Sequence, residues 1–321
     1  MGTMTFGTMA DEAASLAILD AARDAGVNFI DVAEVYPVPP REEYSGRSEE
    51  ICGKWLAGQS RDSMIVATKV AGPGQGWFLP AMRSGSCALD RHHIERAIEG
   101  SLQRLGTDYI DLYQTHWPDP NVPIEETLDA LDRAVEAGKI RYVGCSNQSA
   151  YGLAKSLWMS DLNELVRCET IQNNFSIMHR RFEDELATLC RAEQISLLAY
   201  SPLGGGVLSG KYNGGEWPDP ARFSQYRQDP QRGAAMATRF VNERTLETQE
   251  RVAALAQDAG TTAATFAIAW TLTRDFLGAS LIGARTLVQA QELLAAAELT
   301  LSSDALAACD AISRDIRYPM E

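Results

Sequence analysis

Short apolar runs alternate with amphipathic stretches along the whole chain of 321 residues. The amphipathic stretches carry helix start and stop signals, since residues 11–26, 90–106 and 123–138 each begin with an acid or a proline and end at a glycine. The apolar runs have the length of buried strands, and seven strands are predicted at residues 27–31, 63–70, 108–116, 140–147, 168–174, 195–202 and 278–284. This alternation predicts parallel strands joined by helical crossovers, and hence an α/β fold.

A truncated apolar segment at residues 2–7 would add an eighth strand before the others. Eight strands alternating with helices predict a (β/α)8 TIM barrel, and an open doubly wound sheet is the competing architecture. The open nucleotide-binding sheet carries a GxGxxG turn after its first strand, and this sequence has none there. The barrel is therefore favoured, as a single domain over residues 1–321.

Two long segments rich in glycine and proline interrupt the alternation. Residues 71–89 and 203–240 are too long to be plain turns, and long loops inside compact domains are usually functional or disordered. Both follow the carboxyl end of a predicted strand, the face at which barrel enzymes hold their active sites. Residues 302–321 are predicted to form a capped terminal helix and a tail.

Composition and charge narrow the range of partners. A hydrophobic content of 45% with 22% charged residues is typical of a soluble globular protein. The net charge of −14 argues against nucleic acid or an anionic membrane as a partner, but it allows a small anionic ligand held by a few basic side chains. No apolar run approaches the roughly 20 residues that span a bilayer, and the first residues lack the pattern of a signal peptide.

Cysteine and histidine usage indicates the compartment and argues against a metal. The six cysteines form no CxxC pair, which predicts free, mostly buried thiols in a reducing cytoplasm. Of the four histidines only His92 and His93 are close together, and neighbours on a helix point to different sides. No metal site is expected.

Four ionisable side chains follow three consecutive predicted strands. Asp31 ends one strand and Tyr36 lies in the loop after it, Lys69 lies among apolar neighbours in the next strand, and His116 ends the one after that. Each residue alone has an ordinary explanation, as a turn cap, a snorkelling lysine or a satisfied polar group. Side chains from different strands converge at one rim of a barrel, however, so the four together predict an active site.

These residue types suit proton transfer to a carbonyl oxygen. An ion pair with Asp31 would stabilise the Lys69 ammonium in a partly dry site. A positive charge beside a phenol favours the phenolate, so the pKa of Tyr36 is expected to fall from its reference near 10. Such a phenol can donate a proton to a carbonyl and accept one in the reverse reaction, while His116 orients the carbonyl by a hydrogen bond.

Six motifs together resemble the aldo-keto reductase superfamily, in family order over nearly the whole chain: NFIDVAEVYP, IVATKV, DYIDLYQTHWPD, GKIRYVGCSN, LLAYSPLGGGVLSGKY and LIGARTLVQAQELL. The AEVYPVPPR loop and HWPDP are similar to the bacterial branch that resembles potassium channel β-subunit-like reductases. The resemblance implies a catalytic tetrad of Asp31, Tyr36, Lys69 and His116. It also implies NADPH bound in an extended form across the barrel mouth.

The resemblance further implies which residues contact the cofactor. Ser146, Asn147 and Gln172 match the positions that hold the nicotinamide carboxamide, and Tyr200 matches the aromatic residue that stacks on the nicotinamide ring. The remaining expected contacts are Thr3, Met4 and Asp31 at the barrel mouth, Ser201, Leu203 and Gly204 around the pyrophosphate, Lys211 and Arg222 near the phosphates, and Gly283, Arg285, Gln289 and Glu292 at the adenosine end.

The residues themselves favour part of this assignment. The SPLGGG stretch offers free N–H groups and close backbone approach, which a pyrophosphate needs, although a flexible turn has the same composition. Lys211, Arg222 and Arg285 would give a local positive field suited to a 2′-phosphate, although each alone could be a solvated surface charge.

The chain departs from the family pattern at its beginning. The family starts with a hairpin that plugs the barrel, followed by a first strand that ends in LGTM, whereas this sequence opens at MGTMTFG. We expect the hairpin to be missing and the first strand to be clipped, unless the natural start lies upstream of Met1.

Two functions of different classes follow. The first is an NADPH-dependent reductase of aldehydes or ketones with Tyr36 as the general acid. The second is an NADPH-binding accessory or redox-sensing subunit with little turnover. Channel-associated relatives carry asparagine at the fourth tetrad position, so His116 favours the enzyme. The physiological substrate, the strength of the preference for NADPH over NADH and the oligomeric state are not readable from the sequence.

Overall fold

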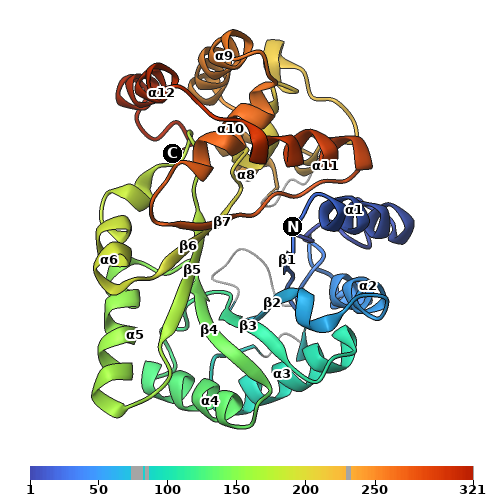
Figure 1. Ribbon diagram of the computed structural model, residues 1–321, viewed down its shortest axis with the longest axis vertical. Coiled ribbons are helices and arrows are strands. Elements are labelled where there is room, and N and C mark those ends of the chain that lie inside the picture. The colour runs from blue at the N-terminus through green and yellow to red at the C-terminus, as the bar shows by residue number, and fades with distance from the viewer. Residues whose placement is uncertain (74–81, 84–86, 229–232, 321) are drawn as a thin grey trace. The chain divides into compact units, whose positions relative to one another are not determined.

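The computed structural model describes residues 1–73, 82–83, 87–228 and 233–320 (Figure 1). The chain divides into two compact units. Unit 1 consists of Met1–Asn173, Leu189–Leu197 and Gly283–Gln291, and unit 2 consists of Asn174–Thr188, Leu198–Ile282 and Glu292–Glu321. The organisation as a single domain stays a prediction. Most of the predicted loop 71–89 lies outside the described residues.

Each of the seven predicted strands is present in one sheet, whose order among the described residues follows the sequence from β1 to β7. The strands are β1 Phe29–Asp31, β2 Ile65–Val70, β3 Ile110–Thr115, β4 Ile140–Ser146, β5 Cys168–Asn174, β6 Ser196–Tyr200 and β7 Leu277–Ser280. The pairs from β1 to β5 are parallel, with Asp31 beside Ala67 and Lys69 beside Gln114. Parallel neighbours in sequence order with helices between them are the topology of a (β/α)8 barrel, so the predicted fold class is confirmed.

The clipped first strand pairs with β1. The Asp31 N–H donates to the carbonyl of Met1 at 2.9 Å, and the Thr3 N–H donates to the carbonyl of Asp31 at 3.0 Å. Gly2 and Asp31 form a single parallel bridge. Residues 1–3 therefore lie where a strand preceding β1 is expected, and this backbone pairing helps to fix Asp31 at the end of β1.

Helices flank the strands of unit 1 on their outer side (Figure 1). They are α1 Glu12–Asp24, α2 Arg47–Leu56, α3 Arg91–Leu105, α4 Ile124–Glu136 and α5 Ala150–Asn163. Sequence signals set their ends: Asp11, Asp90 and Ser149 accept hydrogen bonds from the first turn of α1, α3 and α5. Helices α6 Leu186–Glu193 and α11 Leu287–Leu294 have residues in both units.

The predicted loop 203–240 of unit 2 contains regular structure. It holds 3₁₀ turns at Gly204–Ser209 and Asn213–Gly215 and the helices α7 Arg222–Tyr226 and α8 Gly233–Phe240. Its aromatic side chains form a small core, with the Phe223 ring centroid 4.7 Å from that of Phe240 and 5.9 Å from that of Tyr212. This packing holds a segment that its glycines and prolines would otherwise leave without a fixed conformation.

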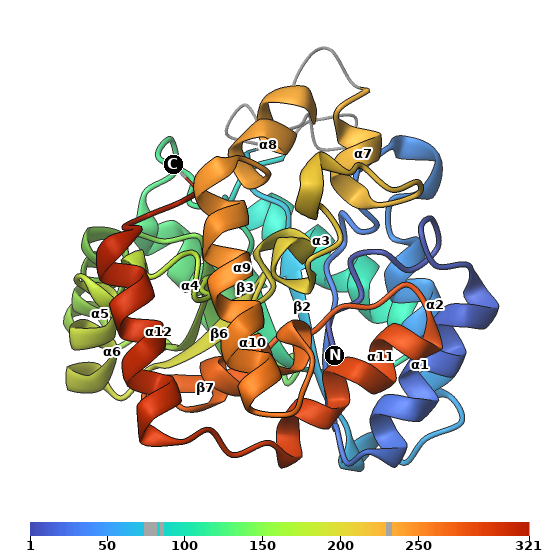
Figure 2. The ribbon, with the colours of Figure 1, turned by 90° about the horizontal axis from the view of Figure 1, so that it is seen from above.

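Three longer helices complete unit 2: α9 Glu243–Asp258, α10 Ala263–Leu272 and α12 Ser303–Asp315. Helix α9 contacts both others, and the three lie side by side in Figure 2. Helix α12 is the predicted terminal helix, and the Ser302 hydroxyl accepts a hydrogen bond from its first turn.

The cysteines are free, and all but the half-buried Cys87 are buried, as predicted. Within the described part of the chain, every helix is too short or too polar to cross a membrane.

Candidate active site

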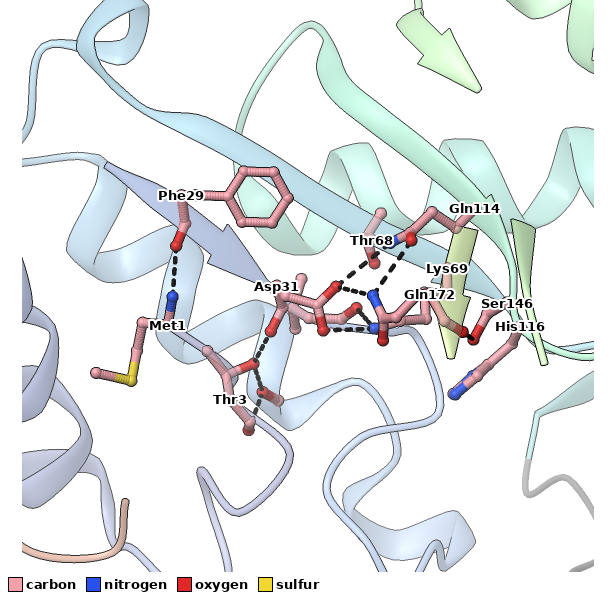
Figure 3. A network of polar contacts seen from close by, with 12 residues as sticks. Met1, Thr3, Phe29, Asp31, Thr68, Lys69, Gln114, His116, Ser146 and Gln172 are labelled. Carbon is pink, nitrogen blue, oxygen red and sulfur yellow. Dashed lines mark hydrogen bonds and ion pairs between the residues drawn. The ribbon is translucent and has the colours of Figure 1, made fainter. Parts of the chain in front are cut away.

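A buried ion pair joins the ends of β1 and β2. The Lys69 ammonium donates to Asp31 Oδ2 at 2.7 Å and to the carbonyl of Val32 at 2.8 Å, and the Lys69 side chain is fully buried (Figure 3). A buried ammonium is costly unless it is paired and hydrogen-bonded, and both conditions are met here. The sequence therefore places a permanent positive charge at this rim of unit 1.

Tyr36 and His116 lie beside that charge. The Lys69 nitrogen is 4.9 Å from the centroid of the Tyr36 ring, and it also hydrogen-bonds the Tyr36 side chain. The rings of Tyr36 and His116 meet edge to face, with centroids 5.6 Å apart. The structure thus brings together all four of the side chains that the sequence singled out, although they come from three consecutive βα segments.

The electrostatics keep Lys69 charged and His116 neutral. Burial lowers the pKa of Lys69, but attraction to Asp31 and Tyr36 outweighs burial, so the pKa lies above its usual 10.5. Burial, together with the charge of Lys69, holds the pKa of His116 well below 6.5. Among the described residues His116 Nδ1 has no hydrogen-bond partner.

Gln114 belongs to the same network, and the sequence reasoning missed it. Its amide nitrogen donates to Asp31 Oδ1 at 3.3 Å, and its oxygen accepts from Gln172 Nε2 at 3.2 Å (Figure 3). Gln172 Nε2 also donates to Asp31 Oδ1 at 2.8 Å. The strand pattern could have indicated Gln114, because alternate residues of a strand point to the same side and Gln114 lies two positions before His116.

Of the expected carboxamide residues, Gln172 is part of this network, and Ser146 and Asn147 lie next to it in unit 1. Ser146 Oγ donates to the carbonyl of Gln172 at 2.7 Å. Asn147 Nδ2 donates to the carbonyl of His116 at 2.8 Å and to Ser146 Oγ at 3.1 Å. Asn147 has a φ of 58°, a left-handed conformation that asparagine tolerates better than most residues. The bonds tie the ends of β3, β4 and β5 together.

Unit 2 contains a run of left-handed residues after β6. Ser201, Gly204, Gly205 and Gly206 have φ values of 53°, 55°, 66° and 100°. A side chain at Gly206 would meet the Lys211 ammonium, because a Cβ there would lie 3.0 Å from Nζ. Successive N–H groups in such turns form anion-binding concavities, so a backbone turn and a nearby cation coincide here.

A family model described as "Aldo/keto reductase family" matches residues 1–314. The chain belongs to the aldo/keto reductase family. The resemblance inferred from the motifs is thereby confirmed. Members of this family are oxidoreductases that act on small-molecule carbonyl substrates and generally use a nicotinamide cofactor.

Three relatives show how far the similarity extends. Protein tas of Escherichia coli (strain K12) is 40% identical over 343 residues, which cover 99% of this chain and 94% of that protein. The "Uncharacterized oxidoreductase YrpG" of Bacillus subtilis (strain 168) is 32% identical, covering 90% of this chain and 83% of its own. The "Probable voltage-gated potassium channel subunit beta" of Oryza sativa subsp. japonica is 33% identical, covering 88% and 81%.

The remaining cofactor positions expected in an aldo/keto reductase divide between the units. In unit 1, the Arg285 N–H donates to Gln289 Oε1 at 3.0 Å. A Cβ at Gly283 would lie 3.6 Å from the carbonyl of Gly2. In unit 2, Glu292 lines a hollow of about 610 Å³ at the start of α10. Also in unit 2, Tyr200 is the last residue of β6 and Arg222 is the first residue of α7.

Thr3 and Met4 have local structural contacts. Thr3 is buried, and its hydroxyl donates to the carbonyl of Asp31 at 3.0 Å and accepts from Ser48 Oγ at 2.9 Å. The Met4 carbonyl accepts the Val38 N–H at 3.0 Å. A cofactor contact by either residue would come in addition to these bonds.

The residues of the left-handed turn fit the pyrophosphate of a nicotinamide dinucleotide. Because Gly206 has no Cβ, a phosphate could approach the backbone at this position. It would then lie next to the Lys211 ammonium. Leu203 and Gly204 lie in the same turn. The Gly204 N–H donates to the carbonyl of Ser201 at 2.8 Å and the Gly206 N–H to the carbonyl of Leu203 at 3.0 Å, so these two N–H groups, which the sequence was expected to leave free, are bonded within the turn.

Proposed function

We propose that the protein reduces an aldehyde or a ketone to an alcohol with NADPH, and that Tyr36 is the general acid. One observation carries this proposal: a buried, permanently charged Lys69 lies beside the Tyr36 phenol, whereas the neighbouring imidazole of His116 is held neutral.

Tyr36 supplies the proton. As the carbonyl oxygen gains negative charge, the Tyr36 hydroxyl donates its proton to that oxygen and becomes a phenolate. The Lys69 ammonium stabilises the phenolate, and Asp31 keeps the ammonium in place at 2.7 Å. In the reverse direction the phenolate takes the proton back from the alcohol.

His116 orients the substrate. A neutral imidazole can donate one N–H to the carbonyl oxygen without competing with Tyr36 as the acid. Since Nδ1 is buried without a partner among the described residues, we assign the ring proton to Nε2. The stacked Trp117 ring, with its centroid 6.5 Å from that of His116, supports this orientation.

The cofactor would be held along the positions described above. Bound NADPH supplies the hydride to the carbonyl carbon. Ser146, Asn147 and Gln172 would bind its carboxamide, Tyr200 would stack on the nicotinamide, and the turn from Ser201 to Gly206 would bind the pyrophosphate. The adenosine end would be held by Gly283, Arg285, Gln289 and Glu292, with Thr3 and Met4 contributing at the nicotinamide end.

The preference for NADPH over NADH is assigned to basic side chains. Lys211 and Arg222 would bind the phosphates, because a 2′-phosphate adds negative charge that only NADPH carries. The cysteine usage suggested a reducing cytoplasm as the location, and NADPH is the cofactor that the family resemblance implied.

A second function has support from relatives described as potassium channel subunits. The rice protein similar to this chain is described as a probable potassium channel β subunit, so an NADPH-binding accessory or redox-sensing subunit is the alternative. It would bind NADPH tightly and turn over little.

A panel of aldehydes, ketones and quinones, assayed by loss of NADPH absorbance, decides between these functions. The reductase predicts saturable turnover with at least one substrate class and weaker binding of NADH in a fluorescence titration. Tight NADPH binding without turnover across the panel would favour the accessory subunit, and equal affinities for the two cofactors would contradict the roles of Lys211 and Arg222.

A further inference from the structure

Glu34 lies between Asp31 and Tyr36 in the sequence, and its carboxylate is completely buried. Among the described residues it accepts the Ala71 N–H at 2.6 Å and two hydrogen bonds from the Arg83 guanidinium, at 2.8 and 2.9 Å. The Arg83 side chain is itself only 10% exposed. A buried carboxylate without such partners would be strongly unfavourable, so Glu34 depends on Arg83.

These contacts connect the Tyr36 turn to the strand that carries Lys69. The Glu34 N–H donates to the Lys69 carbonyl at 3.3 Å, and the Glu34 side chain reaches Ala71, two residues beyond Lys69. The Tyr36 N–H donates to the carbonyl of Ala33, and this bond closes a turn that includes Glu34. The backbone and the side chain of one residue thus hold the turn against the end of β2.

A second contact joins Met82 to the part of the chain that follows Tyr36. Ser45 Oγ donates to Met82 Sδ at 2.7 Å, next to the residue that pairs with Glu34. The following residue, Gly46, donates its N–H to the Tyr36 carbonyl at 3.0 Å. Residues 82 and 83 therefore contact the chain on both sides of Tyr36.

We propose that Glu34 and Arg83 are positioning residues, which hold the Tyr36 turn so that the phenol stays beside the Lys69 ammonium. This inference rests on the proposed role of Tyr36 as the acid. Neither residue touches the reacting atoms. Both act through Tyr36, and Arg83 links that acid to the loop after β2.

The test is a double-mutant cycle with Glu34→Gln, Arg83→Met and the double variant. The rate of aldehyde reduction is measured at saturating NADPH with 4-deuterated and ordinary cofactor. Unfolding in urea and NADPH binding by fluorescence are measured in parallel. A displaced acid is expected to lower kcat about tenfold to hundredfold, to enlarge the isotope effect and to leave NADPH binding unchanged.

The double variant separates positioning from stability. Arg83→Met leaves a lone buried carboxylate, so it should lose stability, and the double variant should regain most of that loss. Positioning predicts that kcat stays low in the double variant. Recovery of kcat together with stability would overturn the proposal, and so would an unchanged kcat in Arg83→Met.

A matched control is available in the same unit. Arg104 Nε donates to the buried Glu49 carboxylate at 2.6 Å, and Glu49 accepts from Thr68 Oγ1 at 2.6 Å. Arg104→Met should reduce stability in a similar way without lowering kcat. If Tyr36→Phe is also fully active, the proposed function fails. If Tyr36→Phe is inactive while both pair variants keep their kcat, only the positioning role fails.

Discussion

The Lys69 ammonium lies 2.7 Å from a carboxylate oxygen of Asp31, and both side chains are buried. Two glutamine amides, from Gln114 and Gln172, donate to the other oxygen of the same carboxylate. The pair is thus hydrogen-bonded on each side. The Lys69 nitrogen is 4.9 Å from the centroid of the Tyr36 ring, so the positive charge lies beside the phenol that would donate the proton.

Asp31→Asn is expected to destabilise the protein, because it leaves the Lys69 ammonium buried without its counter-ion. The free energy of unfolding should fall by about 3–5 kcal/mol, measured by urea denaturation. The double variant Asp31→Asn/Lys69→Met should regain most of this loss. A single variant as stable as the wild type would show that the pair is not buried as described.

His116 should make stability sensitive to acid. Its pKa is well below 6.5 in the folded protein and near 6.5 in the unfolded chain, so below about pH 6.5 the unfolded chain binds the additional proton. Stability from this source is complete above 6.5 and falls as the pH falls through the window below it.

The comparison is between the wild type and His116→Asn, in urea titrations at about pH 5 and about pH 8. The wild type should lose more stability between the two pH values than the variant. Equal losses would mean that His116 does not remain neutral in the folded protein.

Gly206→Ala should weaken cofactor binding. Its φ is 100°, and the new Cβ would lie 3.0 Å from Lys211 Nζ, so the substitution strains the turn and pushes the ammonium aside. We expect the Kd for NADPH to rise on the order of tenfold, equivalent to about 1.4 kcal/mol. Fluorescence titration measures the change.

Gly138→Ala is the control for backbone strain. Gly138 also has a positive φ, 71°, but a Cβ there meets no atom within 4 Å. It should cost stability without changing NADPH affinity. Equal effects of the two substitutions on affinity would remove the turn at Gly206 from the proposed pyrophosphate site.

Much of the fold could be read from the sequence because its signals are local. Apolar runs give the strands, and Asp11, Asp90 and Ser302 begin helices α1, α3 and α12. The helices α7 and α8 were not predicted, because their stability comes from packing among aromatic residues such as Phe223 and Phe240 rather than from local propensity.

The site was predictable to the extent that strand ends meet at one rim. Asp31, Lys69 and His116 follow from this rule alone. The partner of Glu34 does not, because Arg83 lies 49 residues away in a segment without a periodic pattern. A pairing of this kind depends on the path of a loop, which the sequence pattern does not specify.

The most direct test of the central claim is carbonyl reduction by Tyr36→Phe, with Tyr142→Phe, an exposed tyrosine on β4, as the control. Loss of the proton donor should lower kcat for a good aldehyde substrate by about 10² to 10⁴-fold, with NADPH binding unchanged and the control fully active. Reduction at the wild-type rate by Tyr36→Phe would contradict the assignment of Tyr36 as the acid.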